Sequence, residues 1–528
     1  MSAKNLNPLD ASWLMVESRD TPMHVGGLLR FSLPPDAPAD YLLKLMSEFR
    51  HAQKFSPPWN QRLRTPSLKG LMPAWETEDD IDLEHHVRHS ALPRPGGERE
   101  LGQLIARLHS QPLDLARPPW ECVLIEGLAD NQFALYVKMH HSLIDGIGGI
   151  KLLEKAMSPD EKQSRKLPPF WAAGAVARKP GGKRSRAPAP TPAEVIGSVV
   201  EMVKSQVGSL PDIARAFGSM VGALRNKEET LQIPFDAPIS IINGRIHGQR
   251  RFATQRFELL RLKNVAEAAG ATLNDVVLAL CGGALRRFLV ELGELPDKPL
   301  TAGIPVSVRP KDDEGHGNAI TFIISTLGTD IDDPRERLEA ITASTRRAKS
   351  HVQSLPKRAM TQYTMLLMAP YMLSLLSGVG GRTRPMFNIT ISNVPGPDKP
   401  LYYRGARLEA AYPVSLVTHG QALNITCQSY AGYLAFGFTG CRDTLPHMQR
   451  LATYTGKALE ELEEVLLGAS QAPKPVRKPR VRKAAAAAAV TEAAPAKRAR
   501  RPRPAPTTDP TPSLVDAPAS PKRRRKAG

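Results

Sequence analysis

The 528-residue sequence has few cysteines, and they form no metal-binding or disulfide pattern. The four that occur are far apart and make no CxxC pair: Cys122, Cys281, Cys427 and Cys441. Zinc ribbons and small disulfide-stapled folds need closely spaced cysteines, so both classes are excluded. Each cysteine stands in or near an apolar stretch, which predicts small buried side chains in a reducing cytosol.

Motifs for nucleotide hydrolysis and for serine hydrolases are also missing. The sequence contains no GxGxxG and no GxxxxGK[ST], the glycine-rich loops that cradle phosphates. It contains no GxSxG nucleophile turn, and no cysteine stands near a histidine motif. A nucleotide-driven mechanism and a Ser or Cys nucleophile are therefore not indicated.

Long apolar runs are nearly absent. The N-terminus shows no basic-then-apolar leader, so we expect a cytoplasmic protein. Residues 359–379 approach the length of a membrane span, but Pro370 interrupts them and polar residues dilute them. The pattern favours two buried or partly exposed helices over a span, and it leaves open a contact with one face of a membrane.

Proline and positive charge are in excess. The chain has 48 prolines and a net charge of +19, and residues 471–528 hold 16 Lys and Arg against three acidic residues. We predict a disordered tail, rich in Lys, Arg, Ala and Pro, over residues 469–528, because little apolar surface is present there to offset chain entropy. Three roles stay open for it: solubility, attachment to anionic membrane or lipid-droplet surfaces, and non-specific DNA binding.

The rest of the chain divides into two globular parts. We predict a first domain at residues 1–158, a linker with a crossover helix at 159–232, and a second domain at 233–468. Strands mixed with helices in both parts predict an α/β or α+β fold. The predicted strands are 25–31, 122–125, 133–139, 251–257, 300–308, 319–327, 387–392, 423–430 and 433–439, and the predicted helices are 39–51, 101–111, 148–156, one from residue 274 and one over 445–466.

The most informative segment is residues 139–146. An apolar, strand-like run leads into His140-His141, and Asp145-Gly146 follows after a three-residue gap. Histidine takes and returns protons near neutrality. Neighbouring strand residues point to opposite faces, so only one of the two histidines is expected to face a given cavity. His85-His86 is the same pair without Asp-Gly, and we expect a structural or surface role for it.

The HHxxxDG spacing is the signature of coenzyme-A-dependent acyltransferases of the chloramphenicol acetyltransferase type. Further segments, in order over residues 5–465, resemble the bacterial wax ester synthase/diacylglycerol acyltransferase family. They include Leu9-Asp10-Ala11-Ser12-Trp13, Pro22-Met23-His24-Val25-Gly26, Arg117-Pro118-Pro119-Trp120-Glu121, Asn274-Asp275-Val276-Val277 and Ser392-Asn393-Val394-Pro395-Gly396-Pro397. The family's usual Pro-Leu-Trp is Pro118-Pro119-Trp120 here.

The resemblance implies two acetyltransferase-like domains packed as a pseudo-dimer, with the active site in a tunnel between them. It implies transfer of a long-chain acyl group from acyl-CoA, a substrate, to diacylglycerol or a long-chain alcohol, at the inner face of the membrane or at lipid droplets. No cofactor or metal is expected, because adjacent histidines diverge and no third ligand stands at a known spacing. Two other functions stay open: a carrier-protein-dependent condensation-type acyltransferase, and a non-catalytic lipid-droplet or DNA-tethering protein.

The resemblance assigns His141 as general base, whereas His140 is expected to anchor the strand through a buried hydrogen bond. Asp145 either orients the imidazole or pairs with an arginine that holds the loop. Gly146 is expected to supply a backbone conformation closed to other residues.

Substrate contacts are expected from Trp120, Asn274, Asp275 and Asn393. Asn274 and Asp275 stand at a helix start, where both residue types are favoured N-caps. Alternatively, Asn274 lends an unpaired backbone N–H to an oxyanion. Asn393, in a predicted Pro-Gly loop, either lines the tunnel or forms a plain turn.

Overall fold

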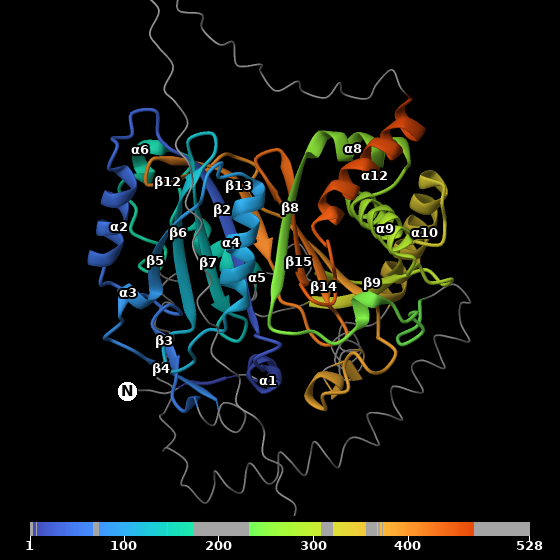
Figure 1. Ribbon diagram of the computed structural model, residues 1–528, viewed down its shortest axis with the longest axis horizontal. Helices are drawn as coiled ribbons and strands as arrows, with labels where there is room; N and C mark the ends of the chain where they lie inside the picture. Colours follow the sequence, from blue (N-terminus) through green and yellow to red (C-terminus); the bar gives the residue numbers. More distant parts are fainter. Residues whose placement is uncertain are drawn as a thin grey trace, which may run out of the picture. The chain divides into compact units, whose positions relative to one another are not determined.

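Two six-stranded sheets form the frame of the protein (Figure 1). The computed structural model describes residues 4–6, 8–66, 73–144, 146–173, 232–307, 320–354, 367, 370–371 and 373–468. All of these belong to one compact unit, residues 1–472. The predicted tail and most of the predicted linker, including its crossover helix, lie outside the described residues.

The strands are β1 (Lys4–Asn5), β2 (His24–Ser32), β3 (Gln61–Leu63), β4 (Ala74–Thr77), β5 (Val87–Ala91), β6 (Trp120–Leu128), β7 (Gln132–His140), β8 (Arg250–Glu258), β9 (Thr301–Ser307), β10 (Ile320–Thr326), β11 (Ile389–Val394), β12 (Tyr402–Tyr403), β13 (Ala406–Val414), β14 (Leu423–Tyr430) and β15 (Tyr433–Cys441). The helices are α1 (Pro8–Val16), α2 (Tyr41–His51), α3 (Leu83–His86), α4 (Glu98–Ser110), α5 (Gly146–Glu154), α6 (Glu161–Ser164), η2 (Ile241–Asn243), α8 (Leu259–Ala268), α9 (Leu273–Leu292), α10 (Pro334–Gln353) and α12 (Arg450–Leu467).

The first sheet has the strand order β12-β13-β2-β7-β6-β5. The antiparallel strands β6 and β7 are joined by a tight turn in which Asp130 and Asn131 both have positive φ, as short hairpins require. One face of the sheet packs on α2, α3 and α5 through a core rich in aromatic residues. The amphipathic helix α4 covers the other face and also packs against β8 of the second sheet.

The second sheet has the order β10-β9-β11-β14-β15-β8. Helices α8, α9, α10 and α12 pack together on one of its faces, on the side away from the first sheet (Figure 1). The apolar stripe predicted from residue 274 is α9, whose residues fill the core of this half.

Strands β12 and β13 come from the C-terminal half of the chain but belong to the first sheet. β13 pairs with β2 and also packs on β14 and β15. At this crossing, a Cβ atom on Gly437 would stand 1.8 Å from the carbonyl oxygen of Pro413, so only glycine fits. The domain boundary predicted at residue 233 assigned β12 and β13 to the second domain alone. Their place in the first sheet connects the two halves.

The α/β class is confirmed, and every predicted strand and helix outside the linker and outside residues 359–379 has a counterpart among these elements. The longest elements that were not predicted are α1, α8, α10 and β13. Helix α10 begins with Asp333 as N-cap and Pro334 at its first position, a start signal that the sequence does carry.

Only part of residues 359–379 is described, because 355–366, 368–369 and 372 lie outside the described residues. Residues 370–371 and 373–376 are helical. Among the helices that the structure describes, none alone is long and apolar enough to cross a membrane. Helices α8 and α9 reach that length only as a pair bent by 98°, and most of α9 is buried in the core.

Candidate active site

The two histidines of the HHxxxDG motif stand at the end of β7. His140 is the last residue of the strand and pairs with His24 of β2. His141 is the first residue beyond it, and its backbone N–H donates to the carbonyl of Met23 at 2.8 Å. The loop that precedes β2 therefore fixes where the His141 ring can point.

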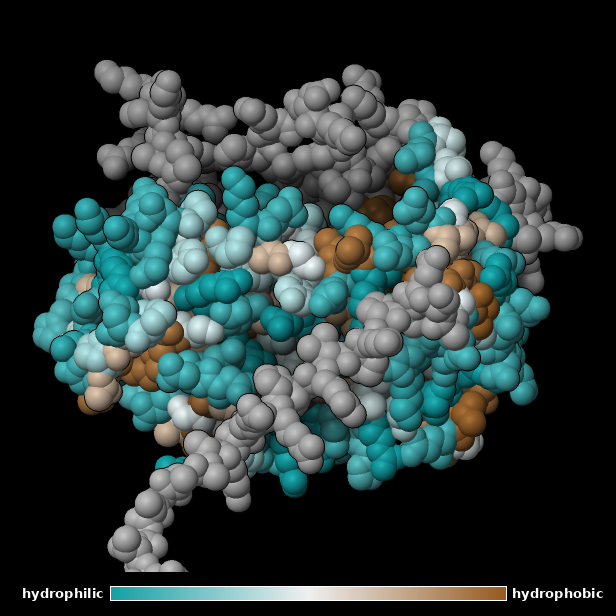
Figure 2. Space-filling model, turned by 90° about the horizontal axis from the view of Figure 1, so that it is seen from above, coloured by the Kyte–Doolittle hydropathy of each residue, from teal (hydrophilic) through white to brown (hydrophobic). Residues whose placement is uncertain are grey.

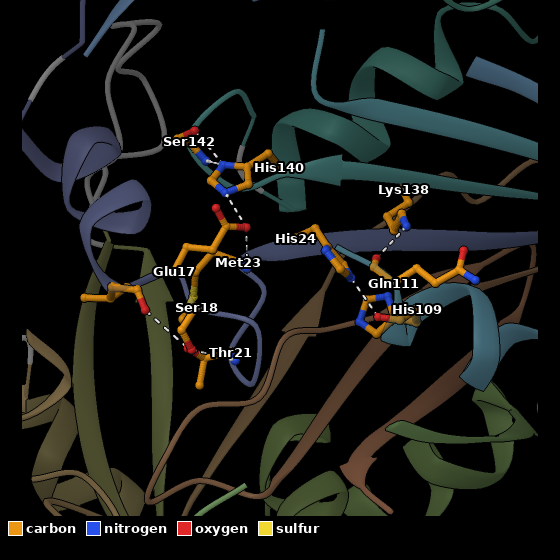
Figure 3. Close-up of polar contacts among 11 residues, drawn as sticks. Glu17, Ser18, Thr21, Met23, His24, His109, Gln111, Lys138, His140 and Ser142 are labelled. Carbon is orange, nitrogen blue, oxygen red and sulfur yellow. Dashed lines mark hydrogen bonds and ion pairs between the residues drawn. The ribbon is translucent and has the colours of Figure 1, made fainter. Parts of the chain in front are cut away.

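His140 is completely buried, and Ser142 and Glu17 lie next to its two ring nitrogens (Figure 3). Its Nδ1 accepts the backbone N–H of Ser142 at 3.1 Å and lies 2.6 Å from the Ser142 hydroxyl. Because a nitrogen that accepts carries no proton, the ring proton is on Nε2. That Nε2 lies 3.4 Å from Oε1 of Glu17, whose side chain is only 6% exposed. His140 thus serves as an anchor between the strand end and Glu17.

His141 is only partly buried. Its ring packs against Trp13 of α1, with the ring centroids 4.4 Å apart and the planes tilted by 37°. An aromatic contact of this kind restricts the orientation of the imidazole without using its nitrogens. Trp13 belongs to a segment that resembles the family, but it was not predicted as a site residue.

The loop from residue 17 to residue 23 supports both histidines. The backbone N–H of Met23 donates to Oε1 of Glu17 at 3.4 Å. The Thr21 hydroxyl lies 2.8 Å from that of Ser18, and the loop is braced from the second half, where Arg250 donates to the carbonyl of Asp20 at 2.7 Å. The sequence reasoning missed Glu17, because its contact with His140 spans more than a hundred residues of chain.

Asp145 lies outside the described residues, so its two roles remain predictions. Gly146 is the first residue of α5, is exposed, and does not have a positive φ. A Cβ atom added there would meet nothing within 4 Å. The expectation that Gly146 supplies a conformation closed to other residues is therefore wrong.

Trp120 is a core residue and not an accessible substrate contact. Its side chain is completely buried, and its indole N–H donates to the carbonyl of Trp59 at 2.7 Å. Trp171 and His86 both stack on it, with centroids 5.7 Å and 4.6 Å away. Its ring is used in packing within the first half, which corrects the predicted substrate role.

Asp275 is likewise structural. Thr272 is the N-cap of α9, and Asp275 completes a capping box: its Oδ2 accepts from the Thr272 backbone at 2.9 Å and from its hydroxyl at 2.6 Å. The other oxygen accepts from the hydroxyl of Thr345 at 2.6 Å. Both oxygens of the buried carboxylate are therefore occupied, and the predicted substrate contact is corrected.

Asn274 is partly buried on the first turn of α9, which belongs to the helical layer of the second half. Asn393 lies within strand β11, paired with Cys427 of β14, and not in the predicted loop. By alternation it shares the strand face of Ile391, the face covered by the helices. The structure does not bring either asparagine into a contact with His141, and their substrate roles stay predictions.

A second histidine cluster lies behind β2 (Figure 3). Nε2 of His24 lies 2.8 Å from the carbonyl oxygen of His109. The His109 ring bridges the Tyr136 hydroxyl, 2.7 Å from Nδ1, and the Ser415 carbonyl, 3.0 Å from Nε2. Burial lowers the pKa of His24, lowers that of His109 to about 3, and lowers that of His86 to about 4. The rings of His24, His86 and His109 are therefore neutral and have a structural role.

In the part of the chain that the structure describes, no group of three or more His, Cys, Asp or Glu could hold a metal ion.

Comparisons with known proteins match both halves of the chain. Residues 6–277 match the wax ester synthase/diacylglycerol acyltransferase catalytic domain, and residues 316–463 match the WS/DGAT C-terminal domain. A putative diacylglycerol O-acyltransferase of Mycobacterium tuberculosis is 47% identical over 493 residues, covering 87% of this chain and 97% of that protein. The O-acyltransferase WSD of Acinetobacter baylyi is 40% identical over 462 residues, covering 87% and 97%.

Among solved structures, the wax ester synthase/diacylglycerol acyltransferase from Marinobacter aquaeolei matches with a TM-score of 0.70 and 37% identity, over 88% of this chain and 99% of that one. The first condensation domain of the calcium-dependent antibiotic synthetase matches with a TM-score of 0.51 and 16% identity, over 88% and 96%. The second likeness shows the fold alone. It confirms the acetyltransferase-like, two-domain architecture.

The contact between Glu17 and His140 predicts a measurable loss of stability on truncation. Glu17→Ala removes the buried carboxylate that lies 3.4 Å from Nε2 of His140, and the loss of this polar partner is expected to cost about 1–3 kcal/mol of unfolding free energy. Glu17→Gln keeps a side-chain oxygen in place and should lower the unfolding free energy by less. Urea unfolding measures both, and Glu84→Ala, which removes an exposed carboxylate, is the control. A Glu17→Ala protein as stable as the wild type would contradict the assignment.

The buried histidines predict acid lability. Their folded-state pKa values lie below the unfolded value near 6.5, so the unfolded chain takes up protons first as the pH falls. The stabilisation is complete above about pH 6.5 and is lost toward the folded pKa values, at up to about 1.4 kcal/mol per pH unit for each ring. Urea unfolding at about pH 7 and pH 5.5 should show this drop, and His109→Gln should show a shallower slope. Equal unfolding free energies of the wild type at the two pH values would refute it.

Proposed function

The chain belongs to the wax ester synthase/diacylglycerol acyltransferase family, and we propose that it moves a long-chain acyl group from acyl-CoA to a lipid hydroxyl with His141 as general base. Family membership makes the chain an O-acyltransferase with diacylglycerol or a long-chain alcohol as acceptor. The acyl-CoA donor, the chain length and the residue roles are the parts that the proposal adds.

One observation carries the assignment of His141. The two adjacent imidazoles differ in exposure: His140 is completely buried beside Ser142 and Glu17, whereas His141 is partly exposed beyond the strand. A general base must come within hydrogen-bond reach of the proton it removes. Of the pair, His141 is the one with exposed surface that an acceptor hydroxyl could approach, which supports its assignment as the base.

The chemistry needs one proton to move twice. The imidazole of His141 takes the proton of the acceptor hydroxyl as that oxygen attacks the thioester carbonyl carbon. When the tetrahedral intermediate collapses, the C–S bond breaks and the same proton passes to the coenzyme A sulfur. The products are the ester and free coenzyme A thiol, so coenzyme A takes part as a substrate and is consumed with each turnover.

Trp13 and Met23 position the base without taking part in proton transfer. The Met23 carbonyl holds the His141 backbone, and Trp13 limits the rotation of its ring. Fixing a catalytic group in this way replaces orientational entropy that would otherwise be lost in the transition state. A backbone N–H at the start of α9 as oxyanion donor, and Asp145 as support for the loop, are further parts of the proposal.

The proposal predicts release of free thiol when the purified protein meets palmitoyl-CoA and either diacylglycerol or hexadecanol. His141→Ala should lower turnover by at least about 10²-fold, because general-base assistance is worth 10²–10⁴-fold. Thiol release is followed with a colorimetric thiol reagent, and the ester product by chromatography.

His85→Ala is the matched control, since it alters the other His-His pair of the chain at its less buried member. It should leave turnover unchanged. Thermal unfolding of both variants shows whether a loss of turnover comes from the missing side chain or from an unfolded protein. A folded His141→Ala protein with wild-type turnover would end the general-base assignment.

A further inference from the structure

Three large apolar side chains are exposed within one short segment of the second half. Leu373 and Leu376 are each 43% exposed and Val379 is 39% exposed. Leu373 and Leu376 stand one helical turn apart, so they share a side of the helix. Single exposed aliphatic residues are common on soluble proteins, but a cluster marks an interaction surface.

The inner side of this segment is firmly packed. The ring of Tyr371 stacks on Phe387, with centroids 6.1 Å apart, and its hydroxyl lies 3.2 Å from that of Thr418. Tyr371 and Phe387 belong to a small core cluster with Ile324. The exposed leucines therefore form the outer side of an anchored element.

The charged residues of the surrounding sequence are of one sign. Residues 340–397 contain no Asp or Glu, but they contain seven Lys and Arg. Of these, Arg382 and Arg384 are exposed directly after the apolar segment. Arg245, which follows η2, adjoins it and donates to the Gly378 carbonyl at 2.9 Å.

We propose that Leu373, Leu376, Val379, Arg382 and Arg384, the 373–384 surface, dock the protein on an anionic phospholipid surface. Aliphatic side chains enter the boundary between headgroups and acyl chains, and arginines pair with phosphates. A nucleic acid would use the arginines but would leave the aliphatic residues in water, since phosphate contacts need only cations. Charge together with apolar exposure therefore favours lipid.

The 373–384 surface is connected to the candidate site. Arg245 joins Gly378 to the segment that ends in Arg250, which holds the Asp20 carbonyl. The same loop continues to Met23, whose carbonyl binds the His141 backbone. In Figure 1 the amber helical segment near residue 375 lies at the same lower edge as α1. A docked protein would thus present its active-site loop near the lipid that holds its acceptor.

The opposite face has a different character. Figure 2 views the molecule from above, and this face is mostly hydrophilic, with apolar residues scattered between polar ones. Other exposed apolar residues of the second half include Leu260 in α8 and Val290 in α9, at 66% and 54% exposure. They supply matched controls for the exposed leucines.

Vesicle sedimentation of the full chain tests the proposal. The wild type should bind vesicles of phosphatidylcholine with one third phosphatidylglycerol. Leu373→Ser/Leu376→Ser should bind them about tenfold more weakly, and the deficit should persist at high salt because it is apolar. Arg382→Glu/Arg384→Glu should also bind at least about tenfold more weakly, but only on anionic vesicles at low salt.

Two control pairs keep the basic tail intact. Leu260→Ser/Val290→Ser and Lys44→Glu/Lys263→Glu change exposed residues of the same kinds elsewhere and should bind as the wild type does. The proposal is overturned if Leu373→Ser/Leu376→Ser binds the vesicles like the wild type. It is also overturned if Lys44→Glu/Lys263→Glu weakens binding as much as Arg382→Glu/Arg384→Glu does, because binding would then be a non-specific electrostatic attraction. A wild-type protein that does not bind these vesicles would overturn it as well.

Docking and acyl transfer are separable. Leu373→Ser/Leu376→Ser should keep wild-type turnover with a short, water-soluble alcohol and lose turnover only with acceptors held in vesicles. A wild type that binds vesicles but esterifies no alcohol would refute the proposed function and leave the docking surface standing.

Discussion

One main-chain hydrogen bond, from the N–H of His141 to the carbonyl of Met23, sets the geometry of the candidate site. It lies where the β2–β7 ladder ends, so His140 remains in the sheet and His141 is placed beyond it. The same loop brings Glu17 to the inner ring, and α1 brings Trp13 to the outer one. Two chemically identical neighbours thus receive different environments, one closed and one accessible.

The rest of the architecture keeps that strand end in place. Strand β13, from the C-terminal half, pairs along β2, and α4 of the first half packs on β8 of the second. Arg250 reaches across to hold Asp20 in the loop before β2. A site on one domain is therefore supported by both, and separating the halves would disturb it. The expected tunnel between the domains remains a prediction of the family resemblance.

Local sequence patterns predicted the strands, the fold class and the family, because alternation and motif spacing depend on neighbours in sequence. The roles of single side chains in the folded protein were harder to predict. Trp120 stands beside a family motif, and nothing in the sequence separates a packed indole from an exposed one. The N-cap of α9 was expected at Asn274 or Asp275 and is Thr272, although Thr272 and Asp275 already have the spacing of a capping box. Glu17 could not be predicted, since only the folded chain brings it to His140. Exposure at Leu376 is likewise a property of packing, not of composition.

The proposed reaction depends on which imidazole meets the reacting oxygen. A crystal structure of the protein with a non-hydrolysable acyl-CoA thioether and a bound acceptor alcohol tests this most directly. The acceptor hydroxyl is predicted to lie within hydrogen-bond reach of a His141 ring nitrogen, about 2.6–3.2 Å, with His140 still closed against Glu17 and Ser142. A hydroxyl held by another residue, with the His141 ring turned away from the thioether, would contradict the account.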